Sequence, residues 1–265
     1  MAFALTEPDA GSNTHKLSTR AERVEGGYRI RGTKYYISDV DESAALLLVA
    51  RTGDENLRVG AALSLFIVPT DVKGLEAAPI AVEMVSSEKQ FTLFFDDVIV
   101  GEESLVGELG RGFRQVFSGL NPERITGAAV VNGITLYALD KAARYACERV
   151  VWDKPIGAHQ GLAHPLAMAK IDVELARLMT SKAAWLYDNG LQAGEAANMA
   201  KYAAAEAASR ALDQAIQTHG GNGLASEYGL ADLWGVTKLF HLAPVSREMV
   251  LNFVAQHSLG LPKSY

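Results

Sequence analysis

One change of pattern, at the turn 107–112, constrains the fold of this chain more than any other feature. Before the turn, short apolar runs are separated by glycine-containing segments, which is typical of β-strands. After it, the chain is rich in alanine and its apolar residues recur at helical spacing. The sequence therefore predicts a multidomain α+β protein, with a β-domain over 1–108 and a helical domain over 109–265.

The first domain contains several short strands joined by turns. The turns Glu25-Gly26-Gly27 and Val72-Lys73-Gly74 supply the residues that reverse a chain. Several short strands at this spacing favour a small antiparallel β-barrel or sandwich, and we expect the barrel. The expected strands cover 28–38, 44–52, 62–70 and 88–100.

The second domain is expected to be an antiparallel four-helix bundle. Short loops between long helices make successive helices antiparallel neighbours. The small residues of 203–216 allow close approach of helices. The expected helices cover 112–151, 161–190, 194–219 and 236–258, with a short one near 227–234.

Composition limits the possible partners and the compartment. The net charge is −6 and basic residues form no block, which argues against nucleic acid as a main partner. The sequence shows no cleavable leader and no apolar run long enough to cross a membrane. The single cysteine, Cys147, cannot form an internal disulfide. We therefore expect a cytoplasmic enzyme that is not inserted in a membrane.

Several common site patterns do not occur in the sequence. The six histidines show no paired ligand spacing, so we expect no metal site. There is no P-loop, no GxGxxG between a strand and a helix, and no GxSxG. Metal-dependent, Rossmann-type and α/β-hydrolase chemistry are therefore disfavoured.

A lone carboxylate, Glu123, lies in an unusual stretch of the first expected helix. Gly119 and Gly127 are one helical turn away on either side, so the helix face of Glu123 is expected to carry no bulk. Pro122 precedes it and removes one helical N–H. Glu123 is followed by Arg124, and the alternative interpretation is a solvated Glu–Arg pair near a helix break.

Six segments of the chain, taken in their order, resemble the acyl-CoA dehydrogenase family. They are TEPDAGSN (6–13), GTKYYIS (32–38), FDDVIV (95–100), GELGRGF (107–113), ERVVWDKPIGAHQ (148–160) and QTHGGNG (217–223). The resemblance covers essentially all 265 residues. It implies a flavoprotein oxidoreductase of fatty acid and lipid metabolism. The N-terminal helical domain of that family has no counterpart in these residues, so we expect them alone to retain FAD weakly.

The resemblance implies FAD as the cofactor and assigns residues to its flavin half. The backbone of Ala4 and Leu5 and the hydroxyl of Thr6 are expected to face the pyrimidine ring. Ser12 is expected at the FAD pyrophosphate or the CoA arm. Segment 36–38 is expected against the flavin, with Tyr36 near the ring and Ser38 near N5, and Ile37 between them.

Two later segments resemble those that bind the adenine-diphosphate half of FAD on a neighbouring subunit. Glycines in the second segment let backbone N–H groups approach a phosphate closely. The resemblance thus implies a homodimer or homotetramer, because each flavin site would need two chains. The residues concerned are Arg149, Val151, Trp152, Gln160, Gln217, Gly220 and Gly221.

The implied reaction is α,β-dehydrogenation of an acyl-CoA thioester to the trans-2-enoyl-CoA. Electrons would then pass to an electron-transfer flavoprotein. Most family members carry the catalytic base in a loop before the last helix, where this chain has Phe240-His241-Leu242-Ala243 and no acid. A minority, of isovaleryl- and long-chain type, carry it at the position of Glu123. Asn121 and Arg124 would then contact the CoA pantetheine and brace the carboxylate.

Two other functions remain open at this stage. With the loop acid lost, the chain is also compatible with a non-catalytic subunit that assembles with a homologous partner. An acyl-CoA oxidase of the same architecture would produce peroxide without an electron-transfer flavoprotein. Neither alternative is separated from the dehydrogenase by the sequence.

Overall fold

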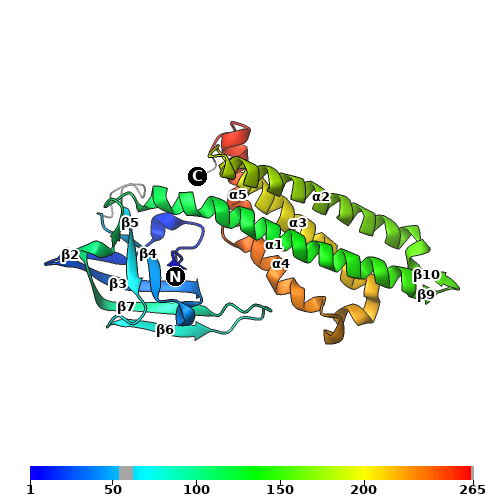
Figure 1. Ribbon diagram of the computed structural model, residues 1–265, viewed down its shortest axis with the longest axis horizontal. Coiled ribbons are helices and arrows are strands. Elements are labelled where there is room, and N and C mark those ends of the chain that lie inside the picture. Colours follow the sequence, from blue (N-terminus) through cyan, green and yellow to red (C-terminus); the bar gives the residue numbers. More distant parts are fainter. Residues whose placement is uncertain (54–61, 264–265) are drawn as a thin grey trace. The chain divides into compact units, whose positions relative to one another are not determined.

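The computed structural model describes residues 1–53 and 62–263 (Figure 1). The chain separates into two compact units, Met1–Gly119 and Leu120–Tyr265. The division falls within the first long helix, α1 (Gly112–Glu148). The domain boundary expected at 108/109 lies just before this helix and stays a prediction.

The first unit is built on one eight-stranded sheet. Its hydrogen-bonded order is β6-β7-β3-β2-β4-β5-β8, with β1 paired to β4. The four expected strands are confirmed as β3, β4, β5 and β7. The strands are β1 (Ala2–Ala4), β2 (Arg20–Val24), β3 (Gly27–Ser38), β4 (Ala45–Arg51), β5 (Leu63–Pro69), β6 (Leu75–Ile80), β7 (Gln90–Gly101) and β8 (Leu105–Val106).

The prediction of a closed antiparallel barrel is wrong. The sheet is open: among the described residues the end strands β6 and β8 do not pair with each other. It is also mixed, because β4 pairs in parallel with both β1 and β2. The short strands β1, β2, β6 and β8 were not among the four expected from the sequence, and β1 and β2 create the parallel pairings with β4.

A buried core covers one face of this sheet. The alternation expected for β3 places Tyr28 and Ile30 inside, where Tyr28 packs edge-on to Phe66 with ring centroids 4.9 Å apart. An irregularity follows on the same strand. Lys34 pairs with Leu93 and Ile37 pairs with Phe91, so β3 carries one extra residue there. Such a β-bulge lets Lys34 and Ile37 both face inward although they are three positions apart.

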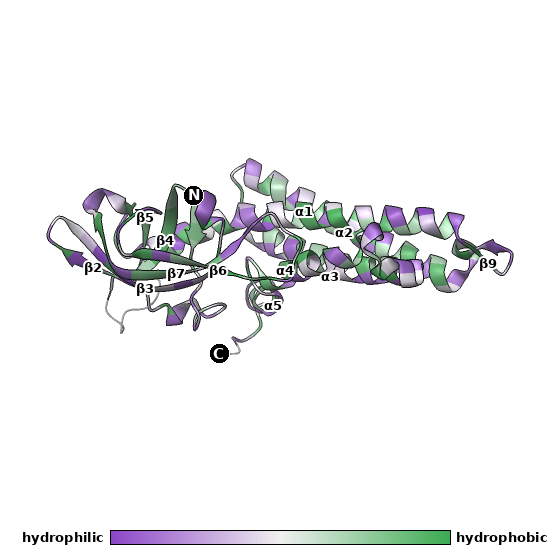
Figure 2. Cartoon of the chain, turned by 90° about the horizontal axis from the view of Figure 1, so that it is seen from below, coloured by the Kyte–Doolittle hydropathy of each residue, from purple (hydrophilic) through white to green (hydrophobic). Residues whose placement is uncertain are grey.

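The second unit contains three long helices that run side by side, as expected (Figure 1). α1 is followed by α2 (Gln160–Asp188) and α3 (Gly194–His219). Alanines of α3 are buried along most of its length, which confirms that small residues line its contacts. In Figure 2, hydrophilic and hydrophobic residues alternate along these helices, as in amphipathic helices that bury one side.

The fourth expected helix is broken. It appears as α4 (Trp234–Leu242) and α5 (Arg247–Phe253), followed by a π-helical turn over Val254–Ser258. Pro244 explains the break, since the residue before a proline avoids the helical conformation, and Ala243 is extended. Ser246 then caps α5 by accepting a hydrogen bond from the N–H of Met249 at 3.4 Å.

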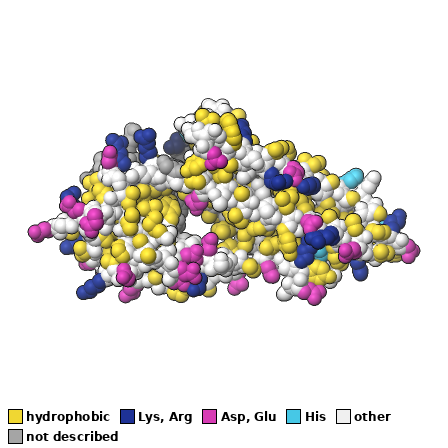
Figure 3. All heavy atoms as spheres, viewed as in Figure 1, with side chains coloured by type: hydrophobic (Ala, Val, Ile, Leu, Met, Phe, Trp, Pro, Cys, Tyr) yellow, Lys and Arg dark blue, Asp and Glu magenta, His cyan; other side chains and the backbone are white. Residues whose placement is uncertain are grey.

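The surface and the helix lengths add two observations. Basic and acidic side chains both occur across the visible face of each unit (Figure 3). Within the described residues, every helix is too short or too polar to cross a bilayer.

Candidate active site

Glu123 lies on an unbroken part of α1. The helix continues through Pro122, so the expected break does not occur. Glu123 is exposed, whereas the neighbouring Arg124 is only 4% exposed. Among the described residues no ion pair joins the two side chains. The alternative of a solvated Glu–Arg pair therefore does not describe this position.

The pKa of Glu123 is raised, which favours a role as a general base. Protein atoms around its carboxylate remove part of its hydration and raise its pKa above the ordinary value, although the side chain still reaches solvent. The charge of Arg124 opposes this rise. A carboxylate with a raised pKa accepts a proton more readily in a reaction at neutral pH.

Arg124 belongs to a buried cationic cluster. Its Nη1 donates to Oδ1 of Asn121 at 2.9 Å, while its Nε has no hydrogen-bond partner within the described part of the chain. Lys201 on α3 is 1% exposed and donates to the carbonyl of Val245. Burial, and then the charge of Arg124, lower the pKa of Lys201 to about 8, while Glu248 raises it. Sequence reasoning missed Lys201, and a lysine among alanines on a helix was its only signal.

The helix face of Glu123 was expected to have free space on both sides, and the structure shows it on the side of Gly119 alone. A Cβ on Gly119 would meet nothing within 4 Å among the described residues, whereas a Cβ on Gly127 would lie 2.7 Å from Cε1 of Phe240. The absence of a side chain at Gly127 therefore makes room for the Phe240 ring. The space beside Glu123 is closed on that side by an aromatic residue.

Residues 240–243, where the resemblance would place the more common base, hold a buried histidine and no acid. Nε2 of His241 lies 2.8 Å from Oγ of Ser209 and 3.1 Å from the carbonyl of Ala205. A carbonyl only accepts, so the contact with Ala205 requires the tautomer with the proton on Nε2, in which Nε2 is not a base toward Ser209. Glu206 approaches Nδ1 of His241 at 3.4 Å, but the same oxygen lies 2.9 Å from Nε of Arg247. Glu206 is thus held in a structural ion pair.

In the first unit, the segment expected to face the flavin is firmly held. Ala4 is buried in β1. The carbonyl of Leu5 accepts from Nζ of Lys34 at 2.8 Å, and that of Thr6 accepts from the N–H of Tyr35 at 2.9 Å. The structure therefore brings the segments 4–6 and 34–36 together.

The expected flavin strand presents its residues unequally. Tyr36 is 52% exposed with φ +55°, and its ring lies 4.4 Å from that of Tyr35. Ile37 is buried, so only its backbone is available to a ligand. Oγ of Ser38 accepts from Nε2 of Gln90 at 2.9 Å, so its hydroxyl already has a partner. Ser12 lies exposed in the turn after β1.

A buried ion pair next to this segment was missed by sequence reasoning. Nζ of Lys34, 0% exposed, lies 2.9 Å from Oε1 of Glu7. Lys34 occupies the same strand face as Tyr28 and Ile30. A lysine at an inward position of an alternating strand was the signal that could have revealed the pair.

The segments expected at the adenine half of FAD are exposed on the second unit. Val150–Val151 and Lys154–Pro155 form a small hairpin, with Trp152 at its tip. Gly220 and Gly221 follow α3, and a Cβ on either would meet nothing within 4 Å among the described residues. Arg149, Gln160 and Gln217 are also exposed.

An aromatic contact joins the end of α1 to the glycine turn. The ring of Tyr145 stacks on His219 with centroids 4.3 Å apart, and its hydroxyl accepts from Nδ2 of Asn222 at 3.1 Å. These residues adjoin a surface depression of about 340 Å³ that is also lined by Lys141 and Tyr228. The segment that follows α1 and the glycine turn that follows α3 therefore lie at helix ends that contact each other through these side chains.

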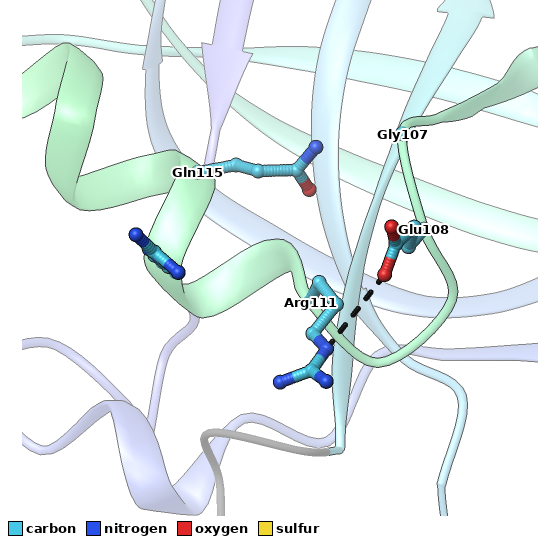
Figure 4. A pocket seen from close by; sticks show the side chains of 5 residues that line it. Gly107, Glu108, Arg111 and Gln115 are labelled. Atoms are coloured by element: carbon cyan, nitrogen blue, oxygen red, sulfur yellow. Dashed lines mark ion pairs between the residues drawn. The ribbon is translucent and has the colours of Figure 1, made fainter.

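A second depression, of about 400 Å³, lies in the first unit at the start of α1 (Figure 4). Arg111 and Glu108 form its ion pair, with Nε and Oε2 3.8 Å apart. None of the expected site residues lines it. Within the described chain, no group of three His, Cys, Asp or Glu side chains is arranged to hold a metal ion.

Two family models match the chain. The model for the acyl-CoA dehydrogenase middle domain covers residues 2–98, and the model for the acyl-CoA dehydrogenase C-terminal domain covers residues 110–259. The chain belongs to the acyl-CoA dehydrogenase family. The resemblance found in the sequence motifs is therefore confirmed.

Similar proteins agree with this assignment. An acyl-CoA dehydrogenase of Mycobacterium tuberculosis is 56% identical over 268 residues, covering 100% of this chain and 69% of that protein. The glutaryl-CoA complex of glutaryl-coenzyme A dehydrogenase has a TM-score of 0.93 at 32% identity, over 99% of this chain and 67% of that one. The FAD complex of PigA has a TM-score of 0.93 at 26% identity, over 98% and 67%.

Family membership settles the activity class and the cofactor. Acyl-CoA dehydrogenases are FAD-dependent oxidoreductases of acyl-CoA thioesters, so both predictions are confirmed at this level. The residues present also fit the cofactor. Open space at Gly220 and Gly221 leaves their backbone accessible to a phosphate, and the ring of Tyr36 is exposed for a flat ligand.

Proposed function

We propose that Glu123 is the base that removes the α-proton of the acyl-CoA thioester. The observation that carries the proposal is an exposed carboxylate on α1 beside the buried Arg124, and partial burial of the carboxylate also raises its pKa. The other family position supports it, because 240–243 contains no acid and the nearby Glu206 is paired with Arg247. The product of the reaction is the trans-2-enoyl-CoA.

Arg124 and Asn121 assist Glu123 in its proposed role as the base. Burial raises the pKa of Glu123, and the Arg124 charge opposes this rise and so favours the ionised carboxylate. The hydrogen bond from Arg124 to Asn121 fixes the guanidinium on the same helix. We assign Asn121 and Arg124 to contact with the CoA pantetheine as well.

Bound FAD supplies the acceptor for the β-hydride. In the first unit, the backbone of Ala4 and Leu5 and the side chains of Thr6, Tyr36 and Ser38 are assigned to the flavin. Ser12 is assigned to the pyrophosphate or the CoA arm. Ile37 contributes through its backbone alone, because its side chain is buried.

The proposed assembly is based on the two exposed segments of the second unit. We assign the adenine-diphosphate half of FAD to these segments on a neighbouring copy, which requires a homodimer or homotetramer. An electron-transfer flavoprotein is the proposed electron acceptor, and the cytoplasm is the proposed compartment. The assigned residues are Arg149, Val151, Trp152, Gln160, Gln217, Gly220 and Gly221.

Flavin bleaching tests the base directly. The FAD-loaded protein is mixed anaerobically with a panel of acyl-CoA thioesters, and absorbance of the oxidised flavin is followed. Glu123→Gln should slow bleaching by about 10²- to 10⁴-fold with FAD still bound. The matched control is Glu174→Gln, since Glu174 is a surface carboxylate paired with Lys170 and Arg177. Bleaching of Glu123→Gln at the parental rate would exclude Glu123 as the base.

The same preparation separates the alternatives. A non-catalytic subunit would not bleach with any thioester and would form a stable complex with a homologue. An oxidase would consume oxygen and produce peroxide during turnover. The dehydrogenase predicts bleaching without appreciable oxygen consumption.

A further inference from the structure

The carboxylate of Glu7 has a complete set of hydrogen-bond donors. Its Oε2 accepts from the backbone N–H and the hydroxyl of Ser18, each at 2.7 Å. Its Oε1 accepts from the N–H of Thr19 at 3.0 Å and from Nζ of Lys34 at 2.9 Å. Four donors from three residues fix both oxygens, so the side chain has one orientation.

Lys34 extends this arrangement to the backbone of the preceding segment. Its ammonium donates to Leu5 as well as to Glu7. The next carbonyl, of Thr6, accepts from Tyr35, the residue after Lys34. Leu5, Thr6 and Glu7 are therefore all attached to the same short piece of β3.

The remaining attachments leave this segment little freedom. Residues Ala2–Ala4 pair in parallel with β4. Glu7 exchanges backbone hydrogen bonds with Ala10 at 3.1 and 3.2 Å, which closes the turn that leads to Ser12. The ion pair thus holds the central part of a segment whose two ends are held by backbone bonds.

The bulge on β3 connects the ion pair to Tyr36. The extra residue lies between Lys34 and Ile37, and both of these are buried. Tyr36 is thereby turned outward with a positive φ, which is uncommon for a residue with a side chain. Because Lys34 anchors one side of the bulge, its contacts determine where the backbone of Tyr36 lies.

A need for stability alone does not account for a charged pair at this depth. Replacement of a buried ion pair by apolar residues of similar volume is often neutral or stabilising, because the charges lose their hydration. An ion pair with hydrogen bonds fixes the orientation of its two side chains and of the backbone groups that they bind, since all partners are held at defined distances. An apolar pair would fill the space without fixing the carbonyl of Leu5.

We infer that Lys34 and Glu7 are positioning residues for FAD, which hold segment 4–6 and Tyr36 in the geometry that accepts the flavin. This inference rests on the proposed function, which assigns those residues to the flavin. Neither side chain touches the cofactor in this role. Each acts through the backbone that it fixes.

The test compares a single with a double replacement. Lys34→Met leaves Glu7 buried and unpaired, whereas Glu7→Leu together with Lys34→Met removes both charges. The FAD dissociation constant is measured by titration of the apoprotein, alongside the urea midpoint of unfolding. The double variant should recover the midpoint lost by the single variant, yet bind FAD at least about tenfold more weakly than the parent. Its bound flavin should have a shifted visible spectrum.

Recovery of the parental FAD affinity and spectrum together with the midpoint would overturn the inference, since the pair would then be structural only. Glu7→Gln provides a second test that does not depend on the double variant folding. It keeps the size and one acceptor oxygen, and it too should weaken FAD binding about tenfold. Parental affinity in Glu7→Gln would likewise overturn the inference.

Controls separate this inference from the proposed function. The exposed pair Arg31–Asp97, with Nε and Oδ1 2.6 Å apart, joins β3, the strand of Lys34, to β7, and Asp97→Asn should leave FAD affinity unchanged. Glu123→Gln should also leave it unchanged. Failure of the parent to bind FAD would be a failure of the proposed function, whereas parental binding by the variants would be a failure of the positioning role.

Discussion

Two lysines are buried among the residues that the structure describes, one in each unit, and their surroundings differ. Lys34 is 0% exposed and Lys201 is 1% exposed. Burial lowers the pKa of each to about 8. Lys34 faces the carboxylate of Glu7, whereas Lys201 donates to the carbonyl of Val245 and is repelled by Arg124.

The difference shows two uses of a buried charge. The pair of Lys34 and Glu7 has no net charge, and the carboxylate oxygens of Glu7 are hydrogen-bonded. Such a pair is suited to fixing the geometry of the backbone. Lys201 and Arg124 are two adjacent cations, and the charge of Arg124 acts on Glu123. That arrangement suits a group that tunes the ionisation of a base. The comparison predicts that the two lysines respond differently to substitution.

The largest effect is expected for Lys34. Lys34→Met leaves the carboxylate of Glu7 buried without its cation, and should lower the free energy of unfolding by about 3–5 kcal/mol. Urea denaturation measures the change. Arg31→Met, in an exposed pair of the same strand, should leave the midpoint unchanged. Equal shifts for the two variants would contradict the importance of burial.

Acid should reveal the same pair through Glu7. Burial raises its pKa, but the charge and hydrogen bond of Lys34 and the bonds from Ser18 and Thr19 lower it further, to about 2 in the folded protein against 4.5. The stabilisation is therefore present above pH 4.5 and is lost as the pH falls toward 2. The loss amounts to about 3 kcal/mol. Urea titrations over this pH range measure it, and Glu7→Gln should flatten the profile.

Packing beside Glu123 can be tested at Gly127. Gly127→Ala places a methyl group 2.7 Å from Cε1 of Phe240 and should cost about 1–3 kcal/mol by overpacking. Gly133→Ala is the matched control on the same helix, where a Cβ meets nothing within 4 Å of the described residues. The control should stabilise the protein by up to about 1 kcal/mol. Thermal unfolding of both variants decides whether Phe240 closes this side.

The smallest effect is expected for Lys201. Lys201→Met removes a charge that Arg124 repels, but it also leaves the carbonyl of Val245 without its donor. These effects oppose each other, so the free energy of unfolding should change by less than about 1 kcal/mol. Lys182→Met, on the exposed side of α2, is the surface control. A loss as large as that of Lys34→Met would remove the distinction between the two lysines.

Strand and helix positions followed from periodicity, but closure of the sheet did not. The alternating and apolar runs predicted β3, β4, β5 and β7, because side-chain pattern reports burial along one strand. Whether β6 and β8 meet depends on pairing between distant segments, which no local pattern encodes. The break in the last helix was readable from Pro244 and was overlooked.

Candidate site residues could be named where a single residue stands out in the sequence. Glu123 was singled out because a carboxylate between glycines is unusual in a helix, and its role as the base came from the family resemblance and stays a prediction. Lys34 and Lys201 were not found, since their burial depends on partners far away in the sequence. The ring of Phe240 against Gly127 is likewise a contact between α1 and α4, and the sequence alone suggested open space there.

Exchange of α-protons is the most direct measurement of Glu123 as the base. The FAD-loaded protein is incubated in D₂O with an acyl-CoA analogue whose β-carbon is replaced by sulfur, so that no hydride can leave, and deuterium at the α-carbon is followed by NMR. The parent should exchange the α-proton, and Glu123→Gln should do so at least about 100-fold more slowly. Exchange by Glu123→Gln at the parental rate would contradict the assignment.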